Sequence, residues 1–135
     1  MANAETTSCS RCSGSSANAK PYAFDDQFGA PTWARPIAEA VATISRPLLA
    51  GDVPGGLSGI YHLACAGRIS WHGFALRIVE RTPESERKAR MVTPIATADN
   101  PTPAQRPLWS VLDCSKLQRT FAVRPPGWED ALQQS

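Results

Sequence analysis

One arginine of the chain stands on a stretch that is stiff enough to hold it in place. Residues 97–117, TADNPTPAQRPLWSVLDCSKL, place Pro101, Pro103 and Pro107 around Arg106. Prolines remove backbone entropy from the unbound state, so they set in advance where a guanidinium on such a loop points. Two interpretations stay open: Arg106 binds an anionic ligand, or it is an ordinary charged residue of a connecting loop.

The remaining acid–base groups show no arrangement typical of an active site. Asp25 and Asp26 are neighbours, and neighbouring side chains of an extended chain point to opposite faces, so no acid/base pair is expected. His62 lies in an apolar stretch, where a structural role is the usual one, and His72 is expected to be solvated or packed. The sequence contains no serine nucleophile elbow and no HExxH helix. No catalytic residue is predicted.

Neither a metal site nor a cofactor loop is predicted. Cys9-x-x-Cys12 has the spacing of half a zinc site or of a redox pair, but no second pair of Cys or His stands at a matching distance. Cys65 and Cys114 stand alone. The GxGxxG and GxxxxGK[ST] loops that cradle phosphates are missing from the sequence. We therefore expect no metal-binding and no cofactor-binding residue, and the role of the CxxC pair stays open.

The composition is that of a small globular protein. Its 135 residues leave room for one domain. A net charge of +2 without a basic run makes nucleic acid an unexpected partner, and no apolar stretch is long enough to span a membrane. Residues 1–20, rich in Ser and Ala, predict a disordered tail without an export signal. A cytoplasmic location with reduced thiols is therefore expected.

Hydrophobic periodicity predicts two amphipathic helices. One is expected from Pro36 onward, and Pro47 is expected to end or kink it near Ser45. Its apolar face consists of Ile37, Val41, Ile44 and Leu48. The other is expected after Ser70, which stands where an N-cap belongs. Its buried stripe consists of Trp71, Phe74, Ala75, Ile78 and Val79.

Shorter signals complete an alternation of strands and helices. Strands are predicted at Tyr22–Phe24, over residues 58–64 (SGIYHLA) and over residues 91–96 (MVTPIA). Asp113 is expected to cap a helix that runs to about Thr120, and residues 127–135 predict a last helical turn or two. Strands that alternate with helices indicate an α/β fold.

Three stretches, in this order and at this spacing, resemble one known family. They are DDQFGAPTWA, GIYHLACAGRISWHGFA and TPAQRPLWSVLDCSKL, and the likeness runs from Asp25 to Leu132. Together they resemble the C-terminal third of dTDP-4-dehydrorhamnose reductases. These extended short-chain dehydrogenase/reductase proteins use NADPH or NADH to reduce the keto group of dTDP-4-keto-rhamnose, the last step of dTDP-rhamnose biosynthesis.

The resemblance implies a fold and a substrate site. Residues 21–135 would form the C-terminal substrate-binding part of a Rossmann-type extended short-chain reductase, α/β in class, without the cofactor-binding Rossmann core. Gln27 and Thr32 of the DQxGxPT motif and Arg106 of the RP motif would bind the dTDP-sugar substrate. A guanidinium offers a planar fork of donors that suits a diphosphate. The tail over residues 1–20 resembles nothing in the family.

The catalytic Tyr-x-x-x-Lys pair of this family has no counterpart in the sequence. Tyr22 and Tyr61 are followed four residues on by Asp26 and Cys65 instead of lysine, and Pro36 stands where the family often has an acidic residue. The resemblance therefore implies a C-terminal fragment of the reductase, inactive alone, whose status as an enzyme is open. No cofactor is expected for this chain alone, and the full-length family suggests a homodimer. The alternative is a stand-alone, non-catalytic nucleotide-sugar-binding or regulatory module.

Overall fold

The structure of most of the chain is described by a computed structural model, which covers residues 21–51 and 56–134. The predicted tail over residues 1–20 lies outside the described residues, and so do Cys9 and Cys12 within it. The disorder of the tail and the role of the CxxC pair therefore stay predictions.

The chain forms two compact units, each drawn from two separate stretches of sequence. The first unit comprises the residues up to Gln27 together with Ser70–Arg106. The second unit comprises Phe28–Ile69 together with Pro107–Ser135. The two-residue strands β2 (Phe28–Gly29) and β3 (Ile69–Ser70) lie where the chain passes from one unit to the other. Each unit therefore has to be completed by a segment far along the sequence.

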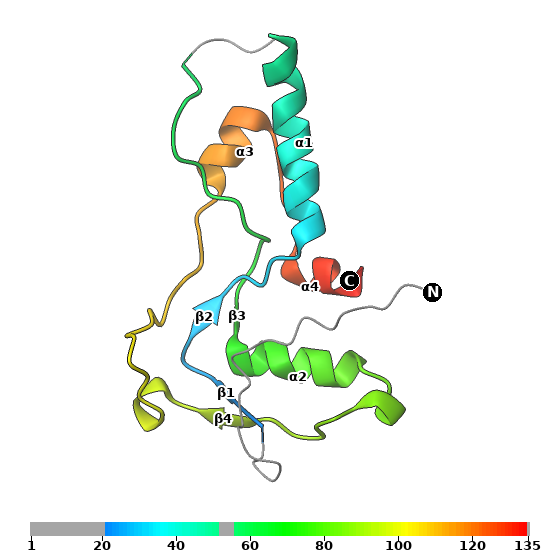
Figure 1. Cartoon of the computed structure of the whole chain (residues 1–135), viewed down its shortest axis with the longest axis vertical. Coiled ribbons are helices and arrows are strands. Elements are labelled where there is room, and N and C mark those ends of the chain that lie inside the picture. Colours follow the sequence, from blue (N-terminus) through cyan, green and yellow to red (C-terminus); the bar gives the residue numbers. More distant parts are fainter. Residues whose placement is uncertain (1–20, 52–55, 135) are drawn as a thin grey trace. The chain divides into compact units, whose positions relative to one another are not determined.

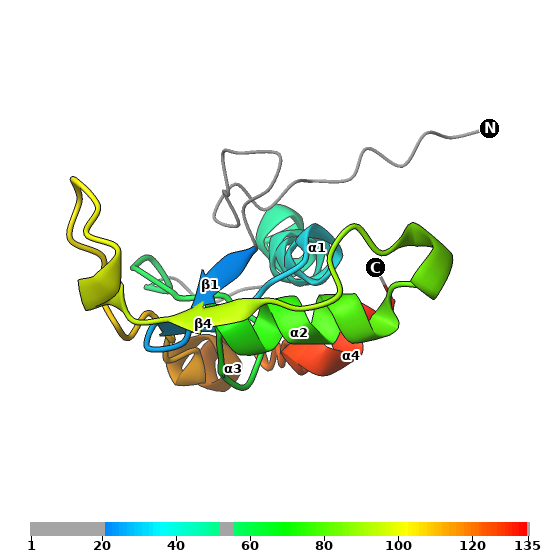
Figure 2. The same cartoon turned by 90° about the horizontal axis from the view of Figure 1, so that it is seen from below.

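The first unit is built on a pair of parallel strands, as the predicted strands require. In this pair β1 (Tyr22–Phe24) lies beside β4 (Thr93–Ile95), and helix α2 (Trp71–Arg81) runs alongside them (Figure 1 and Figure 2). Strands and helix enclose a small apolar cluster made of Ala23, Ala75 and Val92, with Trp71, Leu76 and Val79 packed against it. Two single turns of 3-10 helix, η1 (Glu84–Glu86) and η2 (Thr97–Asp99), flank β4.

Helix α2 begins at the predicted cap. Ser70 has an extended backbone, with φ −73° and ψ 159°, and its hydroxyl accepts a hydrogen bond from the N–H of Gly73 at 3.0 Å. The same hydroxyl donates to the carboxylate of Asp25 at 3.1 Å. The prediction of Ser70 as the N-cap is confirmed. The N–H of Gly73 has no acceptor within the helix, and the hydroxyl of Ser70 provides one.

Replacing Ser70 by alanine is expected to lower the free energy of unfolding by about 1 kcal/mol, because the N–H of Gly73 loses its acceptor. Urea unfolding followed by circular dichroism measures the change. Ser58→Ala is the matched control, since Ser58 is exposed, and it should change stability by less than about 0.5 kcal/mol. Equal stability of the two variants would contradict the capping role of Ser70.

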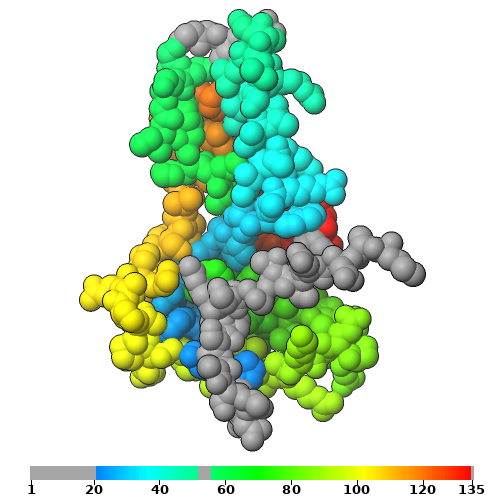
Figure 3. Space-filling view, in the orientation of Figure 1, coloured from blue at the N-terminus to red at the C-terminus, as the bar shows by residue number. Residues whose placement is uncertain are grey.

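Three helices and one extended segment build the second unit. Among the described residues, its helices are α1 (Ala34–Ala50), α3 (Ser115–Phe121) and α4 (Trp128–Gln133), and the short strand β2 also belongs to it. Its core cluster consists of Ala40, Leu117 and Val123, with Ile44, Tyr61, Leu63 and Phe121 packed against it. Figure 3 shows the atoms of α3, in orange, between those of α1, in cyan, and the green segment that follows residue 56. The last predicted helix is confirmed by α4.

Helix α1 is longer than the sequence predicts. It contains Pro47 and runs to Ala50. The next residue, Gly51, caps it: its left-handed backbone (φ 75°) lets its N–H bond back to carbonyls of the last turn. Of the two predicted effects of Pro47, an end of the helix near Ser45 is wrong, and a kink there stays a prediction. Pro47 lacks the N–H that would bond to the carbonyl of Thr43. Thr43 is exposed, so water can satisfy that carbonyl.

The predicted apolar face of α1 is only partly covered. Ala40 is the buried residue of the helix, and Ile44 packs against the same cluster. Ile37, Val41 and Leu48 are 37%, 52% and 47% exposed. Periodicity therefore predicts which side chains share a face, but it does not predict how much of that face the second unit covers.

The predicted strand over residues 58–64 is wrong. This segment forms no strand, although Tyr61 and Leu63 contribute to the core cluster. Its carbonyl groups find side chains instead, since the ammonium of Lys116 donates to the carbonyl of Ile60 at 3.0 Å. The apolar character of this run therefore reflects the burial of its side chains. A strand would also need hydrogen bonds to a neighbouring strand, and this segment has none to any described strand.

Helix α3 begins slightly later than predicted. Asp113 was expected to be the N-cap, but the helix starts at Ser115 and Cys114 occupies the cap position. Asp113 still supplies the missing acceptor, because its carboxylate receives the N–H of Ser115 at 2.9 Å and the hydroxyl of Ser115 at 3.1 Å. These two bonds hold the pKa of Asp113 below its ordinary value.

Candidate functional site

Arg106 lies on an exposed loop that follows η2. Residues 101–110 are all exposed, and three of the positions around Arg106 are prolines. Within the described residues, its guanidinium makes no hydrogen bond, ion pair or ring contact. A charged fork of donors without an internal partner is available to an anion from solution.

The base of this loop is tied to the chain after β1 by a group that we call the Thr97 anchor, made of Asp26, Gln27 and Thr97. The carboxylate of Asp26 accepts the N–H of Thr97 at 2.9 Å and its hydroxyl at 2.8 Å. The side-chain amide of Gln27 donates to the hydroxyl oxygen of Thr97 at 3.0 Å. The loop therefore starts, within the first unit, at a point held by three hydrogen bonds.

Gln27, predicted to bind the substrate, is committed to the interior of the first unit. It is 5% exposed, and its backbone carbonyl accepts the N–H of Trp71 at 3.2 Å. Its side-chain nitrogen is used by Thr97. In this structure Gln27 thus reaches Arg106 only indirectly, through the base of the loop.

The Thr97 anchor makes the stability of the first unit sensitive to acid. The N–H of Thr97 is the main cause that lowers the pKa of Asp26 in the folded protein; partial burial opposes this, and the hydroxyl of Thr97 adds to the lowering. The unfolded chain, with an aspartate pKa of about 3.9, then binds more protons than the folded chain. The stabilisation by Asp26 is complete above that value and is lost as the pH falls through the lowered folded pKa.

Asp26→Asn is therefore expected to flatten the loss of stability in acid. Urea unfolding midpoints would be measured from about pH 7 down to about pH 3 for the wild type and the variant. The wild type should lose stability more steeply below about pH 4, since only it has a carboxylate at this position to protonate. Asp113→Asn is the comparison, because Asp113 carries the same direction of pKa shift in the second unit. A wild-type slope retained in Asp26→Asn would contradict this assignment.

The chain on the far side of Arg106 is held within the second unit. The N–H of Phe28 donates to the carbonyl of Leu108 at 2.8 Å, and the N–H of Ser110 donates to the carbonyl of Phe28 at 2.9 Å. Between these bonds, Trp109 is 54% exposed, and the guanidinium of Arg68 lies 5.2 Å from the centre of its ring. The sequence analysis did not single out this cation–π pair, because 41 positions separate its members.

Thr32, the third predicted substrate-binding residue, belongs to the second unit and to a local turn. Its hydroxyl donates to the carbonyl of Ala30 at 2.9 Å and accepts the N–H of Cys65 at 3.1 Å. The hydroxyl thereby links the GAPT stretch to the LAC stretch. Gln27 and Arg106 belong to the first unit.

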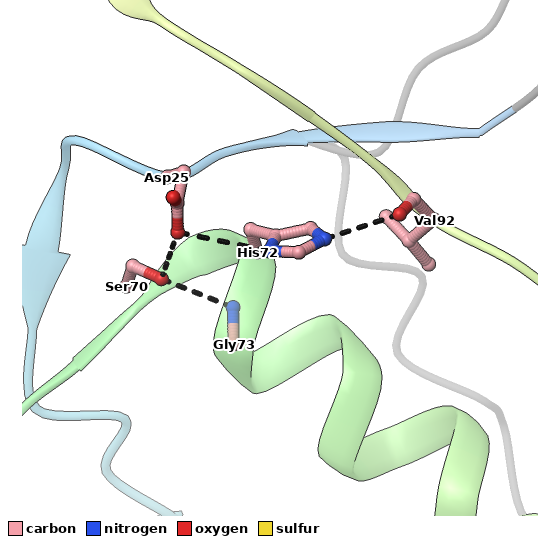
Figure 4. Close-up of polar contacts among 5 residues, drawn as sticks. All are labelled: Asp25, Ser70, His72, Gly73 and Val92. Carbon is pink, nitrogen blue, oxygen red and sulfur yellow. Dashed lines mark hydrogen bonds and ion pairs between the residues drawn. The ribbon is translucent and has the colours of Figure 1, made fainter.

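A cluster of Asp25, Ser70 and His72 resembles a nucleophile arrangement in residue types but not in geometry (Figure 4). The hydroxyl of Ser70 donates to Asp25, while Nε2 of His72 lies 3.1 Å from the carbonyl of Val92. Since a carbonyl only accepts, Nε2 carries a proton and is no base towards Ser70. Nδ1 of His72 lies 3.6 Å from Asp25. The cluster therefore joins β1, α2 and the start of β4, in keeping with the packing role expected for His72.

The other predicted absences can be examined only in part. Among residues 21–51 and 56–134, no group of three or more His, Cys, Asp and Glu side chains is placed to hold a metal ion. Within the same ranges, every helix is too short or too polar to cross a bilayer. His62 is exposed, and Asp25 and Asp26 bind different partners, Ser70 and Thr97.

A model of a known protein family matches nearly the whole chain. The match is to the RmlD substrate binding domain and covers residues 14–135. The chain belongs to this family. The three sequence stretches that suggested the resemblance all lie within the match, and they include Asp26, Gln27, Thr32 and Arg106; Thr97 lies within the match but outside these stretches.

Curated relatives of this RmlD substrate binding domain are dTDP-4-dehydrorhamnose reductases. The chain is 41% identical to the enzyme of Sinorhizobium fredii over 109 residues, which cover 81% of this chain and 36% of the relative. It is 43% identical to the enzyme of Burkholderia thailandensis over 115 residues, which cover 79% of this chain and 38% of the relative. The chain thus spans little more than a third of the length of these relatives.

Solved structures of the same enzyme share the fold of this RmlD substrate binding domain. The dTDP-4-dehydrorhamnose reductase of Bacillus anthracis, solved in complex with NADP, matches with a TM-score of 0.68 at 25% identity. The match covers 84% of this chain and 36% of that one. The enzyme of Clostridium acetobutylicum matches with a TM-score of 0.65 at 27% identity and the same coverage. The predicted α/β class and its assignment to the substrate-binding part of the reductase are confirmed.

Proposed function

We propose that this chain binds the dTDP-sugar substrate of a dTDP-4-dehydrorhamnose reductase and serves as the substrate-binding part of that NAD(P)H-dependent enzyme. The observation that carries the proposal is the match to the RmlD substrate binding domain over residues 14–135. The reaction it would serve is the reduction of dTDP-4-keto-rhamnose in dTDP-rhamnose biosynthesis.

Arg106 is the main substrate contact in this proposal. Its guanidinium is exposed and has no partner among the described residues, and a sugar nucleotide brings a diphosphate that can accept two parallel hydrogen bonds. Thr32 and Gln27 complete the proposed set of substrate-binding residues. The hydroxyl of Thr32 already has a donor and an acceptor, so it would use its remaining lone pair, whereas the buried Gln27 would act through Thr97.

The cofactor is expected to bind outside this chain's own residues. The sequence has neither a glycine-rich phosphate loop nor a Tyr-x-x-x-Lys pair, so no residue here is assigned to NADPH or to proton transfer. The Bacillus anthracis reductase, of which this chain matches 36%, was solved with NADP. Saturable binding of NADPH to the isolated chain, measured by calorimetry, would contradict this division of roles.

A hybrid enzyme tests the proposal. Residues 25–132 of this chain would replace the matching segment of the Burkholderia thailandensis reductase, which is 43% identical. The hybrid is expected to oxidise NADPH only when dTDP-4-keto-rhamnose is present, because the graft carries the proposed substrate-binding residues Gln27, Thr32 and Arg106. The unaltered relative serves as the positive control for activity.

Two outcomes of this experiment are informative. A hybrid that folds and binds NADPH but has no affinity for dTDP-rhamnose would overturn the proposed function. A hybrid that binds dTDP-rhamnose without turning over would instead favour the alternative, a non-catalytic nucleotide-sugar-binding or regulatory module. The reductase names of the relatives favour the first function over the second. A homodimer and a cytoplasmic location stay predictions.

A further inference from the structure

The loop that carries Arg106 is attached to the first unit at its N-terminal end by side chains rather than by apolar packing. The Thr97 anchor provides three hydrogen bonds, and the side chain of Asn100 adds a fourth, to the hydroxyl of Tyr22 at 3.2 Å. Beyond Asn100 every residue up to Arg106 is exposed. The order of the exposed part therefore depends on this attachment and on the prolines.

The hydrogen bonds of the anchor run in one direction. A hydroxyl has one proton, and that of Thr97 goes to Asp26 at 2.8 Å because a carboxylate only accepts. The amide of Gln27 must then donate into a lone pair of the same hydroxyl. The chain Gln27 to Thr97 to Asp26 thus ends on a negative charge, which strengthens each bond and fixes the rotamer of Thr97.

The two partners of Thr97, Asp26 and Gln27, are themselves held in place within the first unit. Gln27 is 5% exposed and is also held through its backbone by Trp71. Asp26 comes two residues after β1, whose register is set by pairing with β4. The anchor therefore fixes the start of the loop against the paired strands β1 and β4 and the buried Gln27.

We propose that Thr97, held by Asp26 and Gln27, is a positioning residue for Arg106: it fixes the base of the loop and so holds the guanidinium ready for the diphosphate of a sugar nucleotide. The role of Arg106 in this statement rests on the proposed function above. The stiffness of the loop does not, because it follows from hydrogen bonds within the chain. The prolines between Thr97 and Arg106 restrict φ at their positions. The backbone of the exposed loop therefore has few alternative conformations, and the position of Thr97 limits where Arg106 can lie.

Backbone order in the full chain provides the first test. Thr97→Val removes the hydroxyl and keeps the branched shape, whereas Thr97→Ser keeps both hydroxyl bonds. Order parameters from amide nitrogen relaxation over the non-proline residues 98–106 are expected to fall from about 0.8 to below about 0.6 in Thr97→Val. They should stay near the wild-type values in Thr97→Ser.

Thr82→Val is the matched control for this measurement. Thr82 also lies in the first unit and donates its hydroxyl to a backbone carbonyl, that of Ile78 at 2.8 Å, but at the end of α2. It should leave residues 98–106 unchanged. Asp26→Asn is a second variant of the anchor, to be used if Thr97→Val does not fold. Loop order that is unchanged in Thr97→Val, or in Asp26→Asn where Thr97→Val does not fold, would overturn the proposal.

Affinity for dTDP-rhamnose in the hybrid enzyme provides the second test. Thr97→Val is expected to weaken binding about threefold to tenfold, and the loss should vanish when Arg106 is already alanine, because the anchor acts through Arg106. Equal losses with and without Arg106 would overturn the positioning role. A hybrid without any affinity for dTDP-rhamnose would contradict the proposed function instead, while the relaxation data would still decide whether Thr97 orders the loop.

Discussion

Replacing Arg106 by alanine is expected to weaken the binding of dTDP-rhamnose by about 2–4 kcal/mol, because a charge-assisted pair with the diphosphate is broken and one partner is left without its counterpart. Arg106→Lys should recover only part of the loss, since an ammonium cannot reproduce a two-pronged contact. Titration calorimetry on the hybrid reductase measures both changes. Stability should hardly change, because Arg106 is exposed and has no internal contact within the described residues.

Arg90→Ala is the matched control for this prediction. Arg90 belongs to the same unit and is also an exposed arginine, but it lies before β4 rather than on the proline-rich loop. It should leave affinity unchanged within experimental error. Equal affinities of Arg106→Ala and Arg90→Ala would return Arg106 to the class of ordinary loop arginines. A large loss of stability with normal affinity would make it a structural residue.

Replacing Leu117 by alanine is expected to lower the free energy of unfolding by about 2–5 kcal/mol. Leu117 is 2% exposed, the lowest exposed fraction in the core cluster of the second unit, which it shares with Ala40 of α1 and with Val123. The loss combines the lost burial of the side chain with a cavity that the small cluster cannot close. Chemical denaturation followed by circular dichroism measures the change in the free energy of unfolding. If the first unit unfolds in a separate transition, the midpoint of that transition should not change.

Leu112→Ala is the control for the effect of Leu117. Leu112 is 47% exposed and precedes the same helix, so its removal should cost less than about 1 kcal/mol. If the two variants were equally stable, Leu117 would not be a core residue that stabilises the second unit. A shift in the transition of the first unit would show that the two units do not respond separately.

Elements with local signals were predictable from the sequence. Ser70 was recognisable as a cap because the cap, the first turn and the apolar stripe lie within ten residues, and the structure confirms it. The strand predicted over residues 58–64 was wrong because its apolar character reflects burial beside α3 and not pairing with another strand. The length of α1 was missed because a proline near the C-terminal end of a helix does not by itself fix where the helix ends, and here the helix continues past Pro47 to Ala50.

The candidate site was predictable only in part. Arg106 could be predicted from the prolines around it and from the resemblance to the reductases. The Thr97 anchor was not, because 71 positions separate Thr97 from Asp26 and nothing in a single sequence links them. The sequence predicted only that Asp26 forms no acid/base pair with Asp25, and its two bonds to Thr97 give it a specific role.

The division of each unit into two stretches has a consequence for synthesis on the ribosome. β1 emerges from the ribosome about 70 residues before its partner β4, so the first unit cannot close until both stretches have been made. Similarly, α1 must wait for α3 to cover Ala40. A nascent chain that stalls before Ser115 therefore carries the apolar side of α1 uncovered, and such a truncated product is a natural client for chaperones and a source of aggregates.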